Sequence, residues 1–90
     1  MMELPEFFAL QMKVMETMDI ELGWLLMKEN GAPSRPPDDV ILISLHKARL
    51  ELTGVDLKLR LESVEWLRAR GYARRGGMPL PPPGVEPFYS

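Results

Sequence analysis

The sequence has 90 residues, of which 46% are hydrophobic, 27% are charged and none is cysteine. This length suits one small domain, since single domains usually take about 100 to 200 residues, and the lack of cysteine excludes a disulfide framework or a thiolate metal site. The formal net charge of −2 argues against a surface built throughout for nucleic acid or anionic lipid, because such surfaces usually carry a clear basic excess.

The N-terminal segment carries acid where a secretory signal would carry base. The longest unbroken apolar stretches, 24–27 and 40–43, are far shorter than the roughly 18 residues of a membrane span. We therefore expect a cytoplasmic protein with no membrane contact.

The first predicted element is a helix at about 5–30. Pro5 suits a first helical turn, no other proline follows within the segment, and Asn30-Gly31 is a typical stop. One apolar stripe with alternating spacings of four and three contains Leu4, Phe8, Gln11, Met15, Met18, Leu22 and Leu25. A second stripe beside it contains Phe7, Leu10, Val14, Thr17 and Trp24.

Together these stripes are wider than the arc of roughly 100° that a helix needs for one core contact. We therefore expect the helix to contact its own domain on one side and a second copy or another protein on the other. Six of the seven methionines lie in residues 1–30, and their flexible side chains suit irregular cores as well as adaptable binding surfaces. The candidate partner-binding residues are Phe7, Phe8, Met12, Met15 and Met18, with Phe88 and Tyr89 near the C-terminus. Core packing is the alternative interpretation of the same stripes.

A connector with three prolines, residues 31–37, precedes a second predicted helix at 39–53. Asp38 or Asp39 can cap this helix, and Gly54 ends it. Ile43 and Leu50, with either His46 or Lys47, share one face at helical spacing.

Residues 55–61 alternate apolar and charged side chains, which is a strand pattern, but a single strand would have no partner here. We therefore predict a third helix at 57–70. It would place four apolar residues on one face: Leu57, Leu61, Val64 and Leu67. The predicted core contains Trp24, Ile43, Leu50, Leu61 and Leu67.

The segment 73–90 is rich in glycine and proline, so an extended or polyproline II conformation is expected. The predicted fold is thus all-α: a small three-helix domain at 1–72, followed by an extended proline-rich C-terminal tail.

Charge is unevenly distributed, with acid prevailing in residues 1–30 and base in residues 57–79. The candidate nucleic-acid-binding residues are Arg68, Arg70, Arg74 and Arg75, beside Tyr72. Arginine offers a planar fork of donors to phosphate, and tyrosine offers a stacking face. The same arginines can instead complement a helix C-terminus or pair with the acidic first helix. A helix-turn-helix fits poorly, because leucines crowd the start of the third helix.

Little in the sequence indicates catalysis. His46 is the sole histidine, the close carboxylate pairs lack a metal-binding loop pattern, and neither a nucleophile elbow nor a phosphate-binding glycine loop is present. We therefore expect a protein that is not an enzyme and needs neither metal nor cofactor.

Two sequence blocks resemble short helical proteins encoded by bacteriophages and prophages, most of which have no assigned function. The blocks are Leu45-His46-Lys47-Ala48-Arg49-Leu50 and Leu59-Arg60-x-Glu62-Ser63-x-x-Trp66-Leu67-x-x-x-Gly71-Tyr72. They lie within residues 45–72, about a third of the chain, and consist of helix-packing residues. The resemblance implies a viral origin, a location in the host cytoplasm or the virion, and a binding role such as inhibiting a host protein or assisting virion assembly.

Two functional hypotheses follow. The first is a non-enzymatic protein–protein interaction module that binds a protein partner or a second copy through the first helix. The alternative is a small nucleic-acid-binding regulator that uses the basic cluster at 68–75. The overall acidity favours the first hypothesis, since the acidic first helix would repel phosphate near the arginines.

Overall fold

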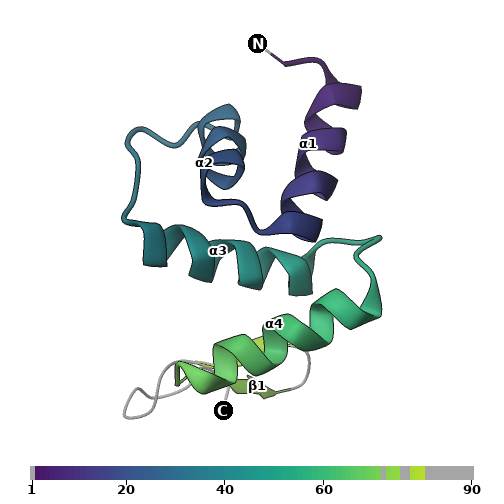
Figure 1. The fold of residues 1–90 in the computed structure, drawn as a ribbon, viewed down its shortest axis with the longest axis vertical. Helices are drawn as coiled ribbons and strands as arrows, with labels where there is room; N and C mark the ends of the chain where they lie inside the picture. Colours follow the sequence, from purple (N-terminus) through teal and green to yellow (C-terminus); the bar gives the residue numbers. More distant parts are fainter. Residues whose placement is uncertain (1, 72, 76–77, 81–90) are drawn as a thin grey trace.

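The computed structural model describes residues 2–71, 73–75 and 78–80, which form four helices followed by a β-hairpin (Figure 1). The helices are α1 (Leu4–Thr17), α2 (Ile20–Glu29), α3 (Asp38–Glu51) and α4 (Leu57–Ala69). Helix α3 is central: α1 and α2 pack together on one side of it, and α4 packs on the other (Figure 1). The predicted small helical domain is confirmed, and residues 57–61 are helical rather than extended.

The predicted continuous helix at about 5–30 is wrong, because the chain breaks between α1 and α2. Met18 adopts a left-handed backbone conformation with φ of 54°, which is uncommon for a residue other than glycine. Thr17 Oγ1 accepts a hydrogen bond from the Asp19 N–H at 3.3 Å, and Asp19 Oδ1 accepts one from the Leu22 N–H at 3.0 Å. These side chains satisfy backbone groups that a continuous helix would pair internally, and Asp19 thereby caps α2.

A compact apolar core joins α1, α2, α3 and the turn before α4. Its buried residues are Val14, Met15, Leu26, Ile41, Leu45 and Val55. Phe7 and Leu10 pack against this cluster, so the second stripe of the predicted first helix faces the core as far as Val14. The first stripe reaches the core only at its inner end, where Met15 is buried.

The predicted buried faces of the second and third helices need correction. Leu67 is buried as predicted, and Trp24, Ile43 and Leu50 are half-buried, but Leu61 is 56% exposed. The contact between α3 and α4 includes polar side chains beside the buried Leu67, although apolar periodicity assigns polar side chains to the surface. The buried polar residues are His46, Arg49 and Ser63.

The proline-rich connector is held by an exposed ion-pair network. Arg35 donates to both carboxylate oxygens of Glu21, at 2.7 and 2.9 Å, and to Asp38 at 3.2 Å. Neither Asp38 nor Asp39 is the N-cap residue of α3, because Pro37 occupies that position, but Asp39 Oδ1 accepts a hydrogen bond from the Val40 N–H at 3.0 Å in the first turn. The hydrogen bond from Arg35 holds the pKa of Glu21 below its usual value, but exposed pairs of this kind contribute little to stability.

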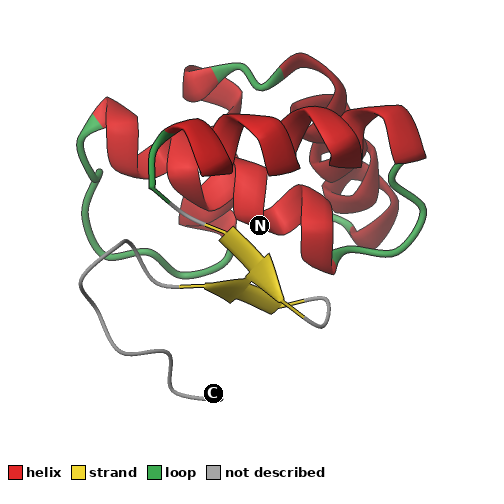
Figure 2. Cartoon of the chain, turned by 90° about the horizontal axis from the view of Figure 1, so that it is seen from below, coloured by secondary structure: helices red, strands yellow, loops and turns green. Residues whose placement is uncertain are grey.

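The hairpin consists of β1 (Ala73–Arg75) and β2 (Met78–Leu80), which pair antiparallel with Ala73 opposite Leu80 (Figure 2). These strands are the described part of the tail predicted at 73–90. Phe88 and Tyr89 lie outside the described residues. Within the described part of the chain, no helix has the length and apolar character needed to cross a bilayer.

Helices α2 and α3 approach closely at Gly23. A Cβ placed on this buried residue would lie 2.7 Å from Leu45 Cδ1 and 3.3 Å from Ile41 Cγ2. Because Leu45 and Ile41 are themselves buried, they have little room to move. The glycine therefore sets the spacing of these two helices.

We expect Gly23→Ala to lower the free energy of unfolding by about 1 to 2 kcal/mol, because overpacking outweighs the gain in helix propensity. A double-mutant cycle with Leu45→Val, measured by urea denaturation, should show that the smaller partner relieves part of the cost. A Gly23→Ala variant more stable than the parent would contradict the close contact.

Candidate functional site

A buried polar cluster joins α3 to α4. His46 and Arg49 lie one turn apart on α3, and Ser63 faces them from α4; the three residues are 7%, 4% and 0% exposed. Arg49 donates from Nη1 to Ser63 Oγ at 3.3 Å, and Ser63 Oγ lies 2.8 Å from His46 Nδ1. The hydroxyl oxygen of Ser63 accepts from arginine, and the same hydroxyl forms a hydrogen bond with His46 Nδ1 whose direction depends on the tautomer of the imidazole.

Arg49 also reaches the end of α1. Its Nε donates to the Met15 carbonyl oxygen at 2.7 Å. This carbonyl belongs to the last turn of α1, where backbone oxygens lack helical partners and the helix dipole attracts cations. Burial lowers the pKa of Arg49, but a guanidinium stays protonated at any pH at which proteins fold. The cluster thus joins α1, α3 and α4 through one buried cation.

An aromatic stack closes the cluster on one side. The His46 ring lies on the Trp66 ring with centroids 4.0 Å apart and planes 19° apart. The Arg70 guanidinium lies 3.6 Å from the centroid of the Trp66 ring, a cation–π contact. Burial and the positive charges of Arg49 and Arg70 lower the pKa of His46 to about 4, so the imidazole is neutral near pH 7.

A serine hydroxyl bonded to a histidine is also the pairing of a nucleophile with its general base. Here Ser63 is 0% exposed and its oxygen already accepts a hydrogen bond from Arg49, so a substrate has no path to it. Among the described residues, no group of three or more carboxylates and histidines could hold a metal ion. The arrangement therefore orients helices. The signal that could have revealed this cluster in the sequence is the three-residue spacing of His46 and Arg49, which places both on one face of a helix.

The outer end of α1 carries the exposed apolar surface of this helix. Leu4 is 69% exposed and Phe8 is 57% exposed, although both belong to the stripe that buries Met15 further along. Glu3 and Glu6 flank them and are also exposed. We call these four residues the α1 end face, and Figure 1 shows this end of the helix projecting from the domain.

The predicted partner-binding residues divide into three groups. Phe8 is exposed, and its ring meets that of the half-buried Phe7 edge-on, with centroids 6.0 Å apart. Met12 and Met18 are half-buried. Met15 is 0% exposed, so its assignment to a binding surface is wrong: it is a core residue, placed where α1 meets α3.

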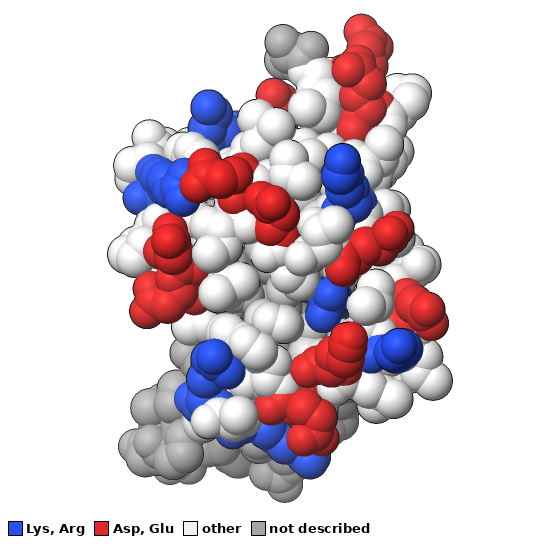
Figure 3. Space-filling view, viewed as in Figure 1, with Lys and Arg blue, Asp and Glu red and all other residues white. Residues whose placement is uncertain are grey.

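The predicted basic cluster lies at the end of α4 and in β1. Arg68 and Arg70 are exposed, and Arg70 is engaged with Trp66. Arg74 and Arg75 are strand residues whose side chains lie outside the description. On the face in Figure 3, basic and acidic side chains are interspersed rather than gathered into one basic patch.

Comparison with known proteins gives no match: no family model matches the chain, and no curated protein or solved structure is significantly similar to it. The geometry of the chain is therefore the basis for its proposed function.

We expect Arg49→Met to lower the free energy of unfolding by about 2 to 4 kcal/mol, because it leaves the buried Met15 carbonyl without a donor. The matched control is Arg68→Met on the exposed end of α4, which should change stability by less than about 0.5 kcal/mol. Urea denaturation followed by circular dichroism measures both. Equal effects from the two variants would contradict the role of Arg49.

Acidification should destabilise the fold through His46. Its pKa is about 4 in the folded chain and near 6.5 when unfolded, so the unfolded chain binds the proton first as the pH falls. Stability is therefore lost from about pH 6.5 down to about pH 4, by roughly 3 kcal/mol in all. Unfolding of the parent and of His46→Gln should be compared across this range. The variant should lose less stability on acidification, whereas parallel curves would exclude this effect of His46.

Proposed function

We propose that this chain is a non-enzymatic protein-binding module that engages an apolar, basic segment of a partner protein through the α1 end face. The observation that carries the proposal is the exposure of Leu4 and Phe8, at 69% and 57%, on a stripe that is buried elsewhere. Large apolar side chains in this setting are typical of binding sites, and aromatic anchors often dominate the energetics of an interface.

The position of the α1 end face supports this role. It lies at the end of α1 that is farthest from α3 (Figure 1), and its two apolar side chains are exposed. Phe7 packs against the core and holds the ring of Phe8 by an edge-on contact. Because Phe8 is already oriented, binding would cost less side-chain entropy than it would for a free aromatic residue. Burying such a side chain contributes about 1.5 to 3 kcal/mol.

Charge indicates the chemistry of the partner. Glu3 and Glu6 flank the apolar pair, and the first basic residue along the chain is Lys13. An acidic rim around an apolar anchor favours a segment with apolar residues and nearby lysine or arginine. The resemblance of the 45–50 and 59–72 blocks to phage and prophage proteins would make such a partner a host protein that is inhibited or a virion component that is assembled.

Nucleic-acid binding has weaker support. Arg70 is engaged with Trp66, and the acidic Glu62 and Glu65 lie on the same helix as Arg68. Phosphate would meet both positive and negative charges there. Nucleic-acid binding through the basic cluster is therefore the competing hypothesis in the test below.

The test compares the tagged full chain with Phe8→Glu in pull-downs from nuclease-treated lysate of the natural host. We expect a stoichiometric partner whose recovery falls about tenfold with Phe8→Glu, because a charge at the anchor opposes burial. Val40→Glu is the matched control: Val40 is exposed at the start of α3, away from the α1 end face, so recovery should persist.

If partner recovery is lost with both variants, or with neither, the partner does not bind through the α1 end face. A parallel pull-down from untreated lysate tests the alternative: material recovered only without nuclease, and lost with Arg68→Ala and Arg70→Ala, would support nucleic-acid binding. Its affinity should then fall steeply as salt rises from about 50 to 200 mM, because phosphate contacts release counterions.

A further inference from the structure

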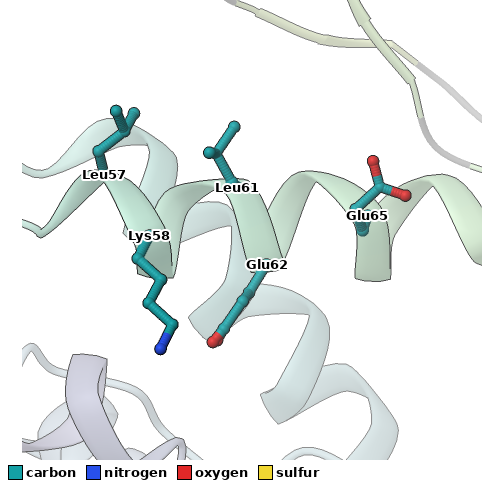
Figure 4. A pocket seen from close by; sticks show the side chains of 5 residues that line it. All are labelled: Leu57, Lys58, Leu61, Glu62 and Glu65. Carbon is teal, nitrogen blue, oxygen red and sulfur yellow. The ribbon is translucent and has the colours of Figure 1, made fainter.

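Helix α4 presents a second exposed apolar surface. Leu57 and Leu61 lie one turn apart and are 66% and 56% exposed, forming a ridge along the helix. A hollow on one side is lined by Leu57, Lys58, Leu61, Glu62 and Glu65 (Figure 4). A hollow on the other side is lined by Leu50, Leu57, Arg60, Leu61 and Val64. The surface thus combines a leucine ridge with a shallow hollow on either side.

This surface is separate from the α1 end face. Helices α1 and α4 lie on opposite sides of α3 (Figure 1), so one partner domain covering the ridge need not touch Phe8. Each leucine would contribute about 1.5 to 3 kcal/mol if buried. The domain itself does not bury them, because α4 packs on α3 through Ser63 and Leu67.

Charges on the same surface are arranged for self-pairing. Lys58 and Glu62 are one turn apart and exposed beside the leucine ridge (Figure 4). Within the described part of the chain, neither residue forms a direct ion pair, but the negative charge of Glu62 acts on the buried Arg49 and favours its protonated form. If two α4 helices lie antiparallel, each Lys58 can face a Glu62 of the other copy. A parallel pair would place like charges together, which is unfavourable.

We propose that α4 pairs antiparallel with α4 of a second copy of this chain, about a two-fold axis that passes near residues 59 and 60. In this register Leu57 of each copy meets Leu61 of the other, and two Lys58–Glu62 pairs flank them. The ridge of each helix enters a hollow of its partner, as in ordinary ridge-into-groove packing. In a two-fold interface each contact occurs twice, so the contacts of this small self-complementary surface are doubled in the dimer.

The first test is sedimentation equilibrium of the full chain from about 1 μM to about 1 mM. We expect a concentration-dependent dimer that becomes monomeric in the Leu57→Glu/Leu61→Glu variant, with an unchanged helical circular dichroism spectrum because both positions are exposed. Phe8→Glu should still dimerise, so this result is independent of the proposed partner site. A monomer throughout the range, or a dimer lost only with Phe8→Glu, would overturn the proposal.

The second test addresses the register. K58E and E62K should each weaken dimerisation about tenfold, since each replaces two attractive pairs by two repulsive ones. An equimolar mixture of the two variants should form a heterodimer, and the K58E/E62K double variant should recover the homodimer. If the charge variants dimerise like the parent, or the mixture stays monomeric, the antiparallel register is wrong.

Discussion

The hydrogen bond from Arg49 to the Met15 carbonyl, at 2.7 Å, is the contact on which the arrangement of the helices depends. Burying a cation is costly unless hydrogen bonds replace its water shell. Arg49 meets this requirement with the negative end of α1 and the Ser63 hydroxyl. Apolar helix faces tolerate small sliding movements, whereas a guanidinium needs its acceptors at fixed places. The cluster therefore fixes the position of α1 relative to α3 and α4.

The break between α1 and α2 makes this contact possible. In a continuous helix the Met15 carbonyl would accept the N–H of Asp19, four residues on. Thr17 Oγ1 takes that N–H instead, and the carbonyl remains available to Arg49. The left-handed Met18 and the buried Arg49 are thus two parts of one feature, although they lie far apart in the sequence.

Local signals in the sequence account for most of the helical segments, including the stops at Asn30-Gly31 and Gly54 and the helix over 57–69. The break could have been found from Thr17 and Asp19, whose side chains favour caps over helix interiors. The buried faces of α3 and α4 could not, because apolar periodicity ranks leucines above polar residues. Only the meeting of Arg49 with a carbonyl 34 residues away explains why this cation is buried on the same helix as Ile41 and Leu45. Leu61, a predicted core residue, is exposed, and so is Leu57, which was predicted to share its helix face.

The packing of α4 and α1 links the interior of the domain to its two outward surfaces. Because α4 turns Ser63 and Leu67 inward, Leu57 and Leu61 face outward. Because α1 is held at its inner end, its outer end lies far from α3 (Figure 1). The two surfaces lie on opposite sides of α3, so pairing through α4 would leave both α1 end faces open. A dimer would then offer two identical sites to a multisubunit partner, and avidity would strengthen an interaction that is weak for one α1 end face.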